Sequence, residues 1–192
     1  VSGDGTQVGN EVCIKNECFY VISSTDSTVT MLSKYNLYVG GEYNSGWTAY
    51  GDEATGIQDS TMLGYVSGQT IRKGTTKFSN TNYWSSTVSS YPAYVYDSNS
   101  TLYNYVESYR TYLESQGAEI EEARLIKYEE LTALGCSSSS MSCSSAPSWV
   151  YATTYWSGEV SGVIRVWMVG STGSFKRDFH YTDDYVLGVR PV

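Results

Sequence analysis

The carboxy-terminal segment gathers the side chains best suited to acid–base or ionic chemistry. Residues 174–192 read SFKRDFHYTDDYVLGVRPV and contain the single histidine of the sequence, His180. Lys176, Arg177 and Asp178 come just before it. A histidine can act as a general base, but a catalytic triad also needs a nucleophile and an orienting partner. No spacing in the sequence nominates either group, so we interpret His180 as a surface or half-buried residue.

The acidic pairs of the chain do not predict a metal or catalytic site. Asp183 and Asp184 supply only two convincing oxygen donors, whereas calcium takes about six or more. The pairs Glu121–Glu122 and Glu129–Glu130 are typical of a solvated face on or next to a helix. The sequence contains no Gly-x-Ser-x-Gly elbow and no glycine-rich phosphate-binding turn. We therefore expect no catalytic residue, no metal and no cofactor.

Four cysteines predict two disulfides. In VCIKNECFYVI, a two-residue turn at Lys15–Asn16 would place Cys13 opposite Cys18 in a non-hydrogen-bonded pair. The Cα atoms of such a pair lie about 4.5 Å apart, which is within disulfide range. Cys136 and Cys143 flank the polar loop SSSSMS, which a second bridge would tie down.

A four-cysteine zinc site is the alternative interpretation of the same residues. Such a site uses two close Cys-x₂₋₄-Cys pairs, and the spacing from Cys136 to Cys143 is too wide for one. We favour disulfides, which form in oxidising compartments and so indicate an extracellular setting.

The composition of the chain limits the classes of partner that it can bind. The 192 residues include 20 acidic and 12 basic side chains, giving a formal net charge of −8, which argues against nucleic acid as a ligand. No apolar run approaches the roughly 20 residues that span a bilayer. The chain opens on VSGDGTQVGNE without an initiator Met, and we expect that a targeting or anchoring segment upstream has been removed.

Periodicity predicts an α+β fold in a single domain, 1–192, with a flexible N-terminus at 1–10. Strands are expected within 11–39 and a mostly irregular region over 40–82. Apolar residues at helical spacing predict one helix over 100–117, capped by Ser100 and ended by Gly117, and a shorter one over 127–135. Aromatic strands follow at 148–156, 163–170, 173–181 and 186–192, with Trp149, Trp156 and Trp167 expected in the core of their sheet.

Several motifs resemble a known family. EARLIKYEELTALG, YWSG, VWMVGSTGSF and the terminal GVRPV resemble the C-type lectin fold in its formylglycine-generating-enzyme-like branch. Within that branch the chain is most similar to bacterial and phage surface proteins, including pilin-like secreted proteins and the variable proteins of diversity-generating retroelements. The resemblance covers residues 120–192 well and residues 11–39 more loosely. It implies two helices packed on antiparallel sheets with long irregular loops.

Two departures from the family limit what the resemblance implies. The enzyme branch uses a reactive cysteine pair near its carboxy terminus, and no cysteine follows Cys143 here, so oxidase activity is not expected. Calcium-dependent lectins carry Glu-Pro-Asn and Trp-Asn-Asp triplets, which are absent. Calcium-dependent sugar binding is therefore not implied.

The resemblance also implies a binding face in the carboxy-terminal segment. In the variable proteins, outward side chains between scaffold motifs are diversified by changes at adenines. The matching positions here are Glu159, Val160, Val163, Ile164, Arg165, Met168, Thr172, Lys176, Arg177, Asp178, His180, Thr182, Asp183, Asp184 and Val186. Adenine changes in an Asn codon can give most of these residue types, but not the Glu, Met and Lys of the set.

These observations predict a non-enzymatic ligand-binding domain displayed on a bacterial cell surface or a phage. The expected partner is a protein or glycan on another cell or host surface. A structural, pilin-like or surface assembly subunit with a lectin-type domain is the alternative, and a hydrophobic prepilin-type helix upstream of Val1 would favour it.

Overall fold

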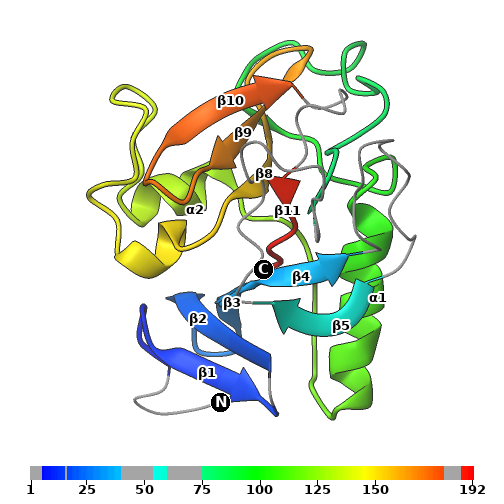
Figure 1. Ribbon diagram of the computed structural model, residues 1–192, viewed down its shortest axis with the longest axis vertical. Helices are drawn as coiled ribbons and strands as arrows, with labels where there is room; N and C mark the ends of the chain where they lie inside the picture. Colours follow the sequence, from blue (N-terminus) through cyan, green and yellow to red (C-terminus); the bar gives the residue numbers. More distant parts are fainter. Residues whose placement is uncertain (1–5, 16, 40–53, 60–74, 180–186) are drawn as a thin grey trace, which may run out of the picture.

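A computed structural model describes residues 6–15, 17–39, 54–59, 75–179 and 187–192 of the chain. In the described parts of the chain, seven strands come first, two α-helices follow, and four further strands come after them (Figure 1). This order confirms the predicted α+β class.

The elements are short and connected by long irregular segments. The strands are β1 (Glu11–Ile14), β2 (Glu17–Ser24), β3 (Val29–Ser33), β4 (Asn36–Val39), β5 (Ala54–Asp59), β6 (Thr75–Thr76), β7 (Ala93–Tyr94), β8 (Tyr155–Val160), β9 (Arg165–Val169), β10 (Phe175–Phe179) and β11 (Leu187–Gly188). The helices are α1 (Tyr103–Ser115), α2 (Tyr128–Ala133) and the 3₁₀ helix η2 (Ser148–Tyr151).

The amino-terminal hairpin has the predicted register. β1 and β2 pair antiparallel with Cys13 opposite Cys18, and a disulfide joins them across a Cα–Cα distance of 4.1 Å. Lys15, in the turn, has a φ of 58°, as a two-residue hairpin with a primed turn requires. β3 pairs with the other edge of β2.

A larger sheet carries the carboxy-terminal half. In the described part of the chain its strands follow the order β10-β9-β8-β11-β6, and β7 also pairs with β8. β10–β9 and β9–β8 are antiparallel, whereas β11 is parallel to β8. The short last strand is therefore inserted in the middle of the sheet, and β10 lies at its edge.

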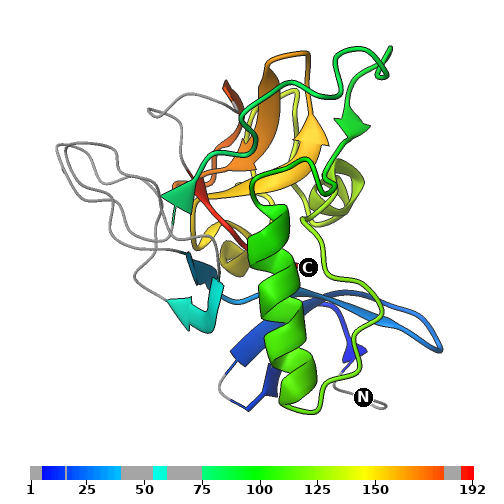
Figure 2. The same ribbon diagram turned by 90° about the vertical axis from the view of Figure 1, so that its right-hand side faces the viewer.

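The two helices cover opposite faces of this sheet. Val166 and Met168 of β9 lie in one buried cluster with Tyr109 of α1, whereas Trp167 and its neighbours lie in a second cluster with Leu131 of α2. Successive side chains of a strand point to opposite faces, so β9 supplies both clusters. Figure 2 shows α1 running from the large sheet toward the amino-terminal hairpin.

Local signals set where the helices end. Gly117 and Gly135 have φ values of 94° and 109°, as expected for glycines that follow a helix. α1 begins at Tyr103, later than predicted, and its N-cap position is Leu102, with no side-chain capping bond. Ser100, the predicted cap, lies before the helix, where its hydroxyl donates to the carbonyl of Phe78 (2.6 Å) and accepts from the amide of Leu102.

The expectation of a strand over 148–156 is wrong in its first half. Residues 148–151 form η2, and β8 begins only at Tyr155. The buried guanidinium of Arg190 donates to the carbonyls of Trp149 (2.8 Å) and Val150 (2.9 Å). A helical turn presents these carbonyls to the buried charge, whereas a strand would use them in its ladder.

The structure describes only parts of the predicted flexible start and of the predicted irregular region. In the expected flexible start, Gly9 N–H donates to the carbonyl of Val21 at 2.8 Å, while residues 1–5 lie outside the described residues. Of the irregular region 40–82, residues 40–53 and 60–74 lie outside them too. Among the helices that the structure describes, none is both long enough and apolar enough to cross a membrane.

Candidate binding surface

The β9–β10 hairpin positions the largest share of the predicted binding residues. The amide of Phe175 donates outward to the carbonyl of Met141 (3.0 Å), so Phe175 and every second residue after it form non-hydrogen-bonded pairs with β9. Arg177 pairs with Trp167 in this way, and Phe179 with Arg165. Side chains approach most closely across such pairs.

Each of these two pairs sets a guanidinium group over an aromatic ring. The Arg177 guanidinium carbon lies 5.6 Å from the ring centroid of Trp167, and that of Arg165 lies 5.0 Å from the ring centroid of Phe179. Trp167 in turn stacks on Phe175 at 4.6 Å. Both arginine side chains are exposed. The rings therefore hold two cations in place at the surface of the hairpin.

The opposite side of edge strand β10 carries Lys176 and Asp178. Lys176 is exposed, and Asp178 is half-buried with its carboxylate accepting from the amide of Phe179 at 3.0 Å. Burial raises the pKa of Asp178, and the charges of Arg165 and Lys176 oppose that rise. Asp178 is thus a carboxylate close to two cations, Arg165 and Lys176.

Arg165, Lys176 and Arg177 differ from three other basic residues of the described chain. Lys34, Arg110 and Arg124 form ion pairs with glutamates. The three cations of the hairpin form none with any described residue. We call their neighbourhood the β10 surface, defined by Arg165, Trp167, Lys176, Arg177, Asp178 and Phe179. It is a locally basic region on an acidic protein.

One buried donor beneath this surface is unsatisfied. The indole Nε1 of Trp167 has no hydrogen-bond partner among the described residues, although the side chain is only 7% exposed. A buried N–H without an acceptor is costly, and such groups are rare in folded proteins.

The β8–β9 turn lies next to the start of β9. The Trp84 indole donates to the carbonyl of Gly162 (3.2 Å), and the Ser161 amide donates to the carbonyl of Arg165 (2.9 Å). These bonds hold Val163 and Ile164 outward, 42% and 40% exposed. Both side chains are therefore available on the surface, and their part in binding stays a prediction. Thr172 is exposed as well, in the β9–β10 turn.

Three of the residues that were expected to point outward are buried or half-buried. Val160 and Met168 are buried in the core, 0% and 7% exposed, because their side chains point to the face of the sheet that packs in one cluster with Tyr109 of α1. Their assignment to an outward surface was wrong. Glu159 is half-buried and accepts a hydrogen bond from the amide of Tyr128 (2.7 Å) at the start of α2. Burial raises the pKa of Glu159, and the bond from Tyr128 opposes that rise.

The remaining predicted residues lie outside the described part of the chain. These are His180, Thr182, Asp183, Asp184 and Val186.

Sequence reasoning missed Met141, which lies at the tip of the loop closed by the Cys136–Cys143 disulfide. Its side chain is 42% exposed, its φ is 52°, and its carbonyl accepts from Phe175 at the start of β10. A non-glycine residue at positive φ is uncommon. The serine-rich loop gave no sequence signal that it would dock on the edge of β10.

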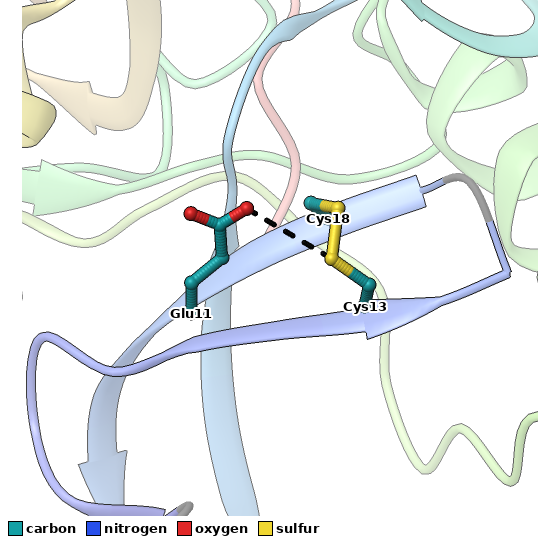
Figure 3. A group of neighbouring side chains, drawn as sticks. All are labelled: Glu11, Cys13 and Cys18. Atoms are coloured by element: carbon teal, nitrogen blue, oxygen red, sulfur yellow. Dashed lines mark hydrogen bonds between the residues drawn. A yellow bond between two sulfur atoms is a disulfide. The ribbon is translucent and has the colours of Figure 1, made fainter.

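Among the described residues, one group of three side chains lies close enough together to hold a metal ion, and it belongs to the amino-terminal hairpin. Glu11, Cys13 and Cys18 place their ligand atoms within 4.8 Å of one another (Figure 3). The two sulfurs form a disulfide, so they are not thiolate ligands, and the Glu11 carboxylate pairs with Lys34 at 2.8 Å. In this state the cluster is a covalent and ionic brace of the hairpin.

Comparisons with family models, curated proteins and solved structures gave no match for this chain. The function is therefore argued from the geometry of the described residues.

Proposed function

We propose that this chain is a non-enzymatic recognition domain of C-type lectin fold, displayed outside the cell on a bacterial surface or a phage, with its binding face on the β10 surface. The observation that carries the proposal is the pair of exposed arginines, each held over the aromatic ring of its cross-strand partner. Cations fixed on a rigid strand pair lose little side-chain entropy when they bind a ligand.

The surrounding frame supports a rigid recognition face. Two disulfides join the described cysteines, and one of them closes the loop that docks on β10. Disulfides persist in oxidising compartments, in keeping with an extracellular location. Hydrogen bonds from Gly170 to Ser174 (2.8 Å) and from Cys143 to Gly173 (2.7 Å) fix the turn that starts β10.

The acidic pairs considered for catalysis support the same proposal. Glu130 binds Arg124 through both of its carboxylate oxygens, at 2.9 and 2.6 Å. Glu122 also contacts Arg124, at 3.2 Å. Carboxylates held in this way stabilise the protein and are poorly placed for proton transfer.

Binding to peptide and glycan arrays tests the proposal. The wild-type protein is expected to bind a defined subset of probes, and the double variant Arg165→Ala/Arg177→Ala is expected to lose those signals while its circular dichroism spectrum stays unchanged. A double variant that keeps the wild-type binding pattern would contradict the assigned face.

The flanking DNA tests the proposed origin as a variable protein. A reverse transcriptase gene and a near-copy of the 3′ end that differs at adenines are expected beside the gene. Their absence would remove the diversification part of the proposal and leave the recognition part in place.

A further inference from the structure

We infer that the β10 surface binds an acidic, extended peptide segment that pairs with the free edge of β10 at Arg177. The inference rests on the proposed recognition function and adds to it the chemical class of the ligand and the way it docks.

The first step is the state of the strand edge. Gly173 and Phe175 use their outward backbone groups to bind Cys143 and Met141 of the disulfide-closed loop. By the alternation of an antiparallel strand, the N–H and C=O of Arg177 point to the same side. No described residue bonds to them there. The docked loop thus covers the start of the edge, and at Arg177 no described residue occupies the backbone groups that an added strand would use.

The second step is the character of the polar groups around that edge. Arg165, Lys176 and Arg177 offer hydrogen-bond donors and no acceptors. The unsatisfied indole N–H of Trp167, beneath Arg177, is also a donor only. A ligand that satisfies these groups must bring acceptors, and carboxylates fit arginine with two parallel hydrogen bonds.

The third step is the charge. This surface carries three cations and one carboxylate, Asp178, which lies close to Arg165 and Lys176. None of the three cations forms an ion pair with a described glutamate or aspartate. The whole chain carries −8, so an acidic ligand is repelled by the protein at large and attracted here. Charge therefore favours this region for an acidic ligand.

The open backbone edge favours a peptide over an acidic sugar. Only a polypeptide offers the alternating N–H and C=O groups that continue a β-sheet. An acidic glycan would engage the arginines and leave the backbone of Arg177 unbonded. The two ligand classes therefore differ in their dependence on backbone hydrogen bonds.

Fluorescence anisotropy with three labelled peptide probes of equal length tests the inference. The first probe alternates Glu and Val, and the second alternates Lys and Val. The third repeats the Glu–Val sequence with every second backbone nitrogen methylated, which keeps the charge and removes strand pairing. We expect binding of the first probe only, with the methylated probe at least about tenfold weaker.

Matched variants locate the site. Arg177→Glu is expected to weaken binding of the Glu–Val probe by about tenfold or more. Lys15→Glu changes the net charge by the same amount on the exposed turn of the amino-terminal hairpin, far from β10 (Figure 1), and is expected to leave binding unchanged. Arg177→Gln removes the charge without reversing it and serves if the Glu variant fails to fold.

The outcomes separate the inference from the proposed function. No binding of the Glu–Val probe, equal binding of its methylated form, or equal weakening by Lys15→Glu overturns the acidic-peptide inference. If a neutral peptide or an acidic glycan instead binds and is lost in Arg165→Ala/Arg177→Ala, the recognition function stands while this inference falls.

Discussion

The guanidinium of Arg124 and the carboxylate of Glu130 form a two-point ion pair, with nitrogen–oxygen distances of 2.9 and 2.6 Å. Their side chains are 10% and 19% exposed. The same carboxylate accepts the amide of Lys127 at 2.9 Å. The pair therefore joins the start of α2 to the segment that pairs with the chain end, where Arg124 and Val192 exchange backbone hydrogen bonds.

Replacing Glu130 by Ala is expected to lower the free energy of unfolding by about 3 kcal/mol, because it leaves the Arg124 charge buried without its partner. Urea denaturation measures the change. Glu129→Ala is the matched control, since Glu129 is the exposed neighbour on the same helix, and it is expected to change stability by less than about 0.5 kcal/mol. Equal effects of the two substitutions would contradict a structural role for the pair.

The substitution Glu159→Gln is expected to stabilise the protein more, relative to the wild type, as pH rises. Burial raises the pKa of Glu159 in the folded protein above its ordinary value, so the folded state holds the proton more tightly than the unfolded state. Ionisation therefore destabilises the folded wild type as pH rises through that raised pKa, while Gln keeps an acceptor for the amide of Tyr128.

Chemical denaturation at about pH 4 and about pH 7 measures this dependence. The unfolding free energy of Glu159→Gln minus that of the wild type is expected to be larger at the higher pH. A difference that shrinks with rising pH would show that ionised Glu159 stabilises the start of α2 through its bond to Tyr128.

The two disulfides are expected to be reduced in a fixed order. Cys13 is exposed and Cys18 half-buried, whereas Cys136 and Cys143 are 4% and 0% exposed within the second core cluster. Mild dithiothreitol followed by alkylation and mass spectrometry should label the first pair before the second, because thiol exchange needs access to a sulfur.

Removal of the Cys136–Cys143 disulfide is expected to lower the stability of the protein. The double variant Cys136→Ser/Cys143→Ser is expected to lose about 2–4 kcal/mol of stability.

In the reduction experiment, earlier labelling of Cys136 and Cys143 than of Cys13 and Cys18 would contradict the burial argument.

Gly135→Ala is expected to destabilise the protein by at least about 1–3 kcal/mol. The φ of Gly135 is 109°, and an added Cβ would lie 2.8 Å from the backbone oxygen of Ser145. Backbone atoms cannot move aside as a flexible side chain can. Gly162→Ala is the control, because a Cβ there meets no atom within 4 Å. Thermal unfolding compares the two, and equal melting temperatures would contradict the steric argument.

Local signals in the sequence predicted the parts of the fold that depend on neighbours along the chain. The pairing of Cys13 with Cys18 follows from one turn and an alternating strand, and Gly117 and Gly135 end their helices as expected. The 3₁₀ helix at Ser148–Tyr151 could not be predicted in this way, because a side chain about 40 residues later, Arg190, binds its carbonyls.

The same distinction between local and long-range determinants applies to the candidate binding surface. The resemblance marked the residues between scaffold motifs, but Val160 and Met168 pack into a core cluster. Arg165, at the start of β9, and Arg177, on the edge strand β10, are exposed. The arginine–aromatic pairs depend on the register of β9 with β10, and Met141 depends on a loop docked from elsewhere in the chain. Neither register nor docking can be inferred from the segment alone.

Trp167→Phe tests whether the unsatisfied indole N–H takes part in binding. Phe keeps an aromatic ring beneath Arg177 and removes the Nε1 donor, so the Glu–Val probe is expected to bind about fivefold more weakly, the loss of one neutral hydrogen bond. Trp149→Phe, in the 3₁₀ helix, is the matched control and should leave the affinity unchanged. Anisotropy titrations compare the two variants. Wild-type affinity in Trp167→Phe would show that Trp167 supports Arg177 through its ring alone.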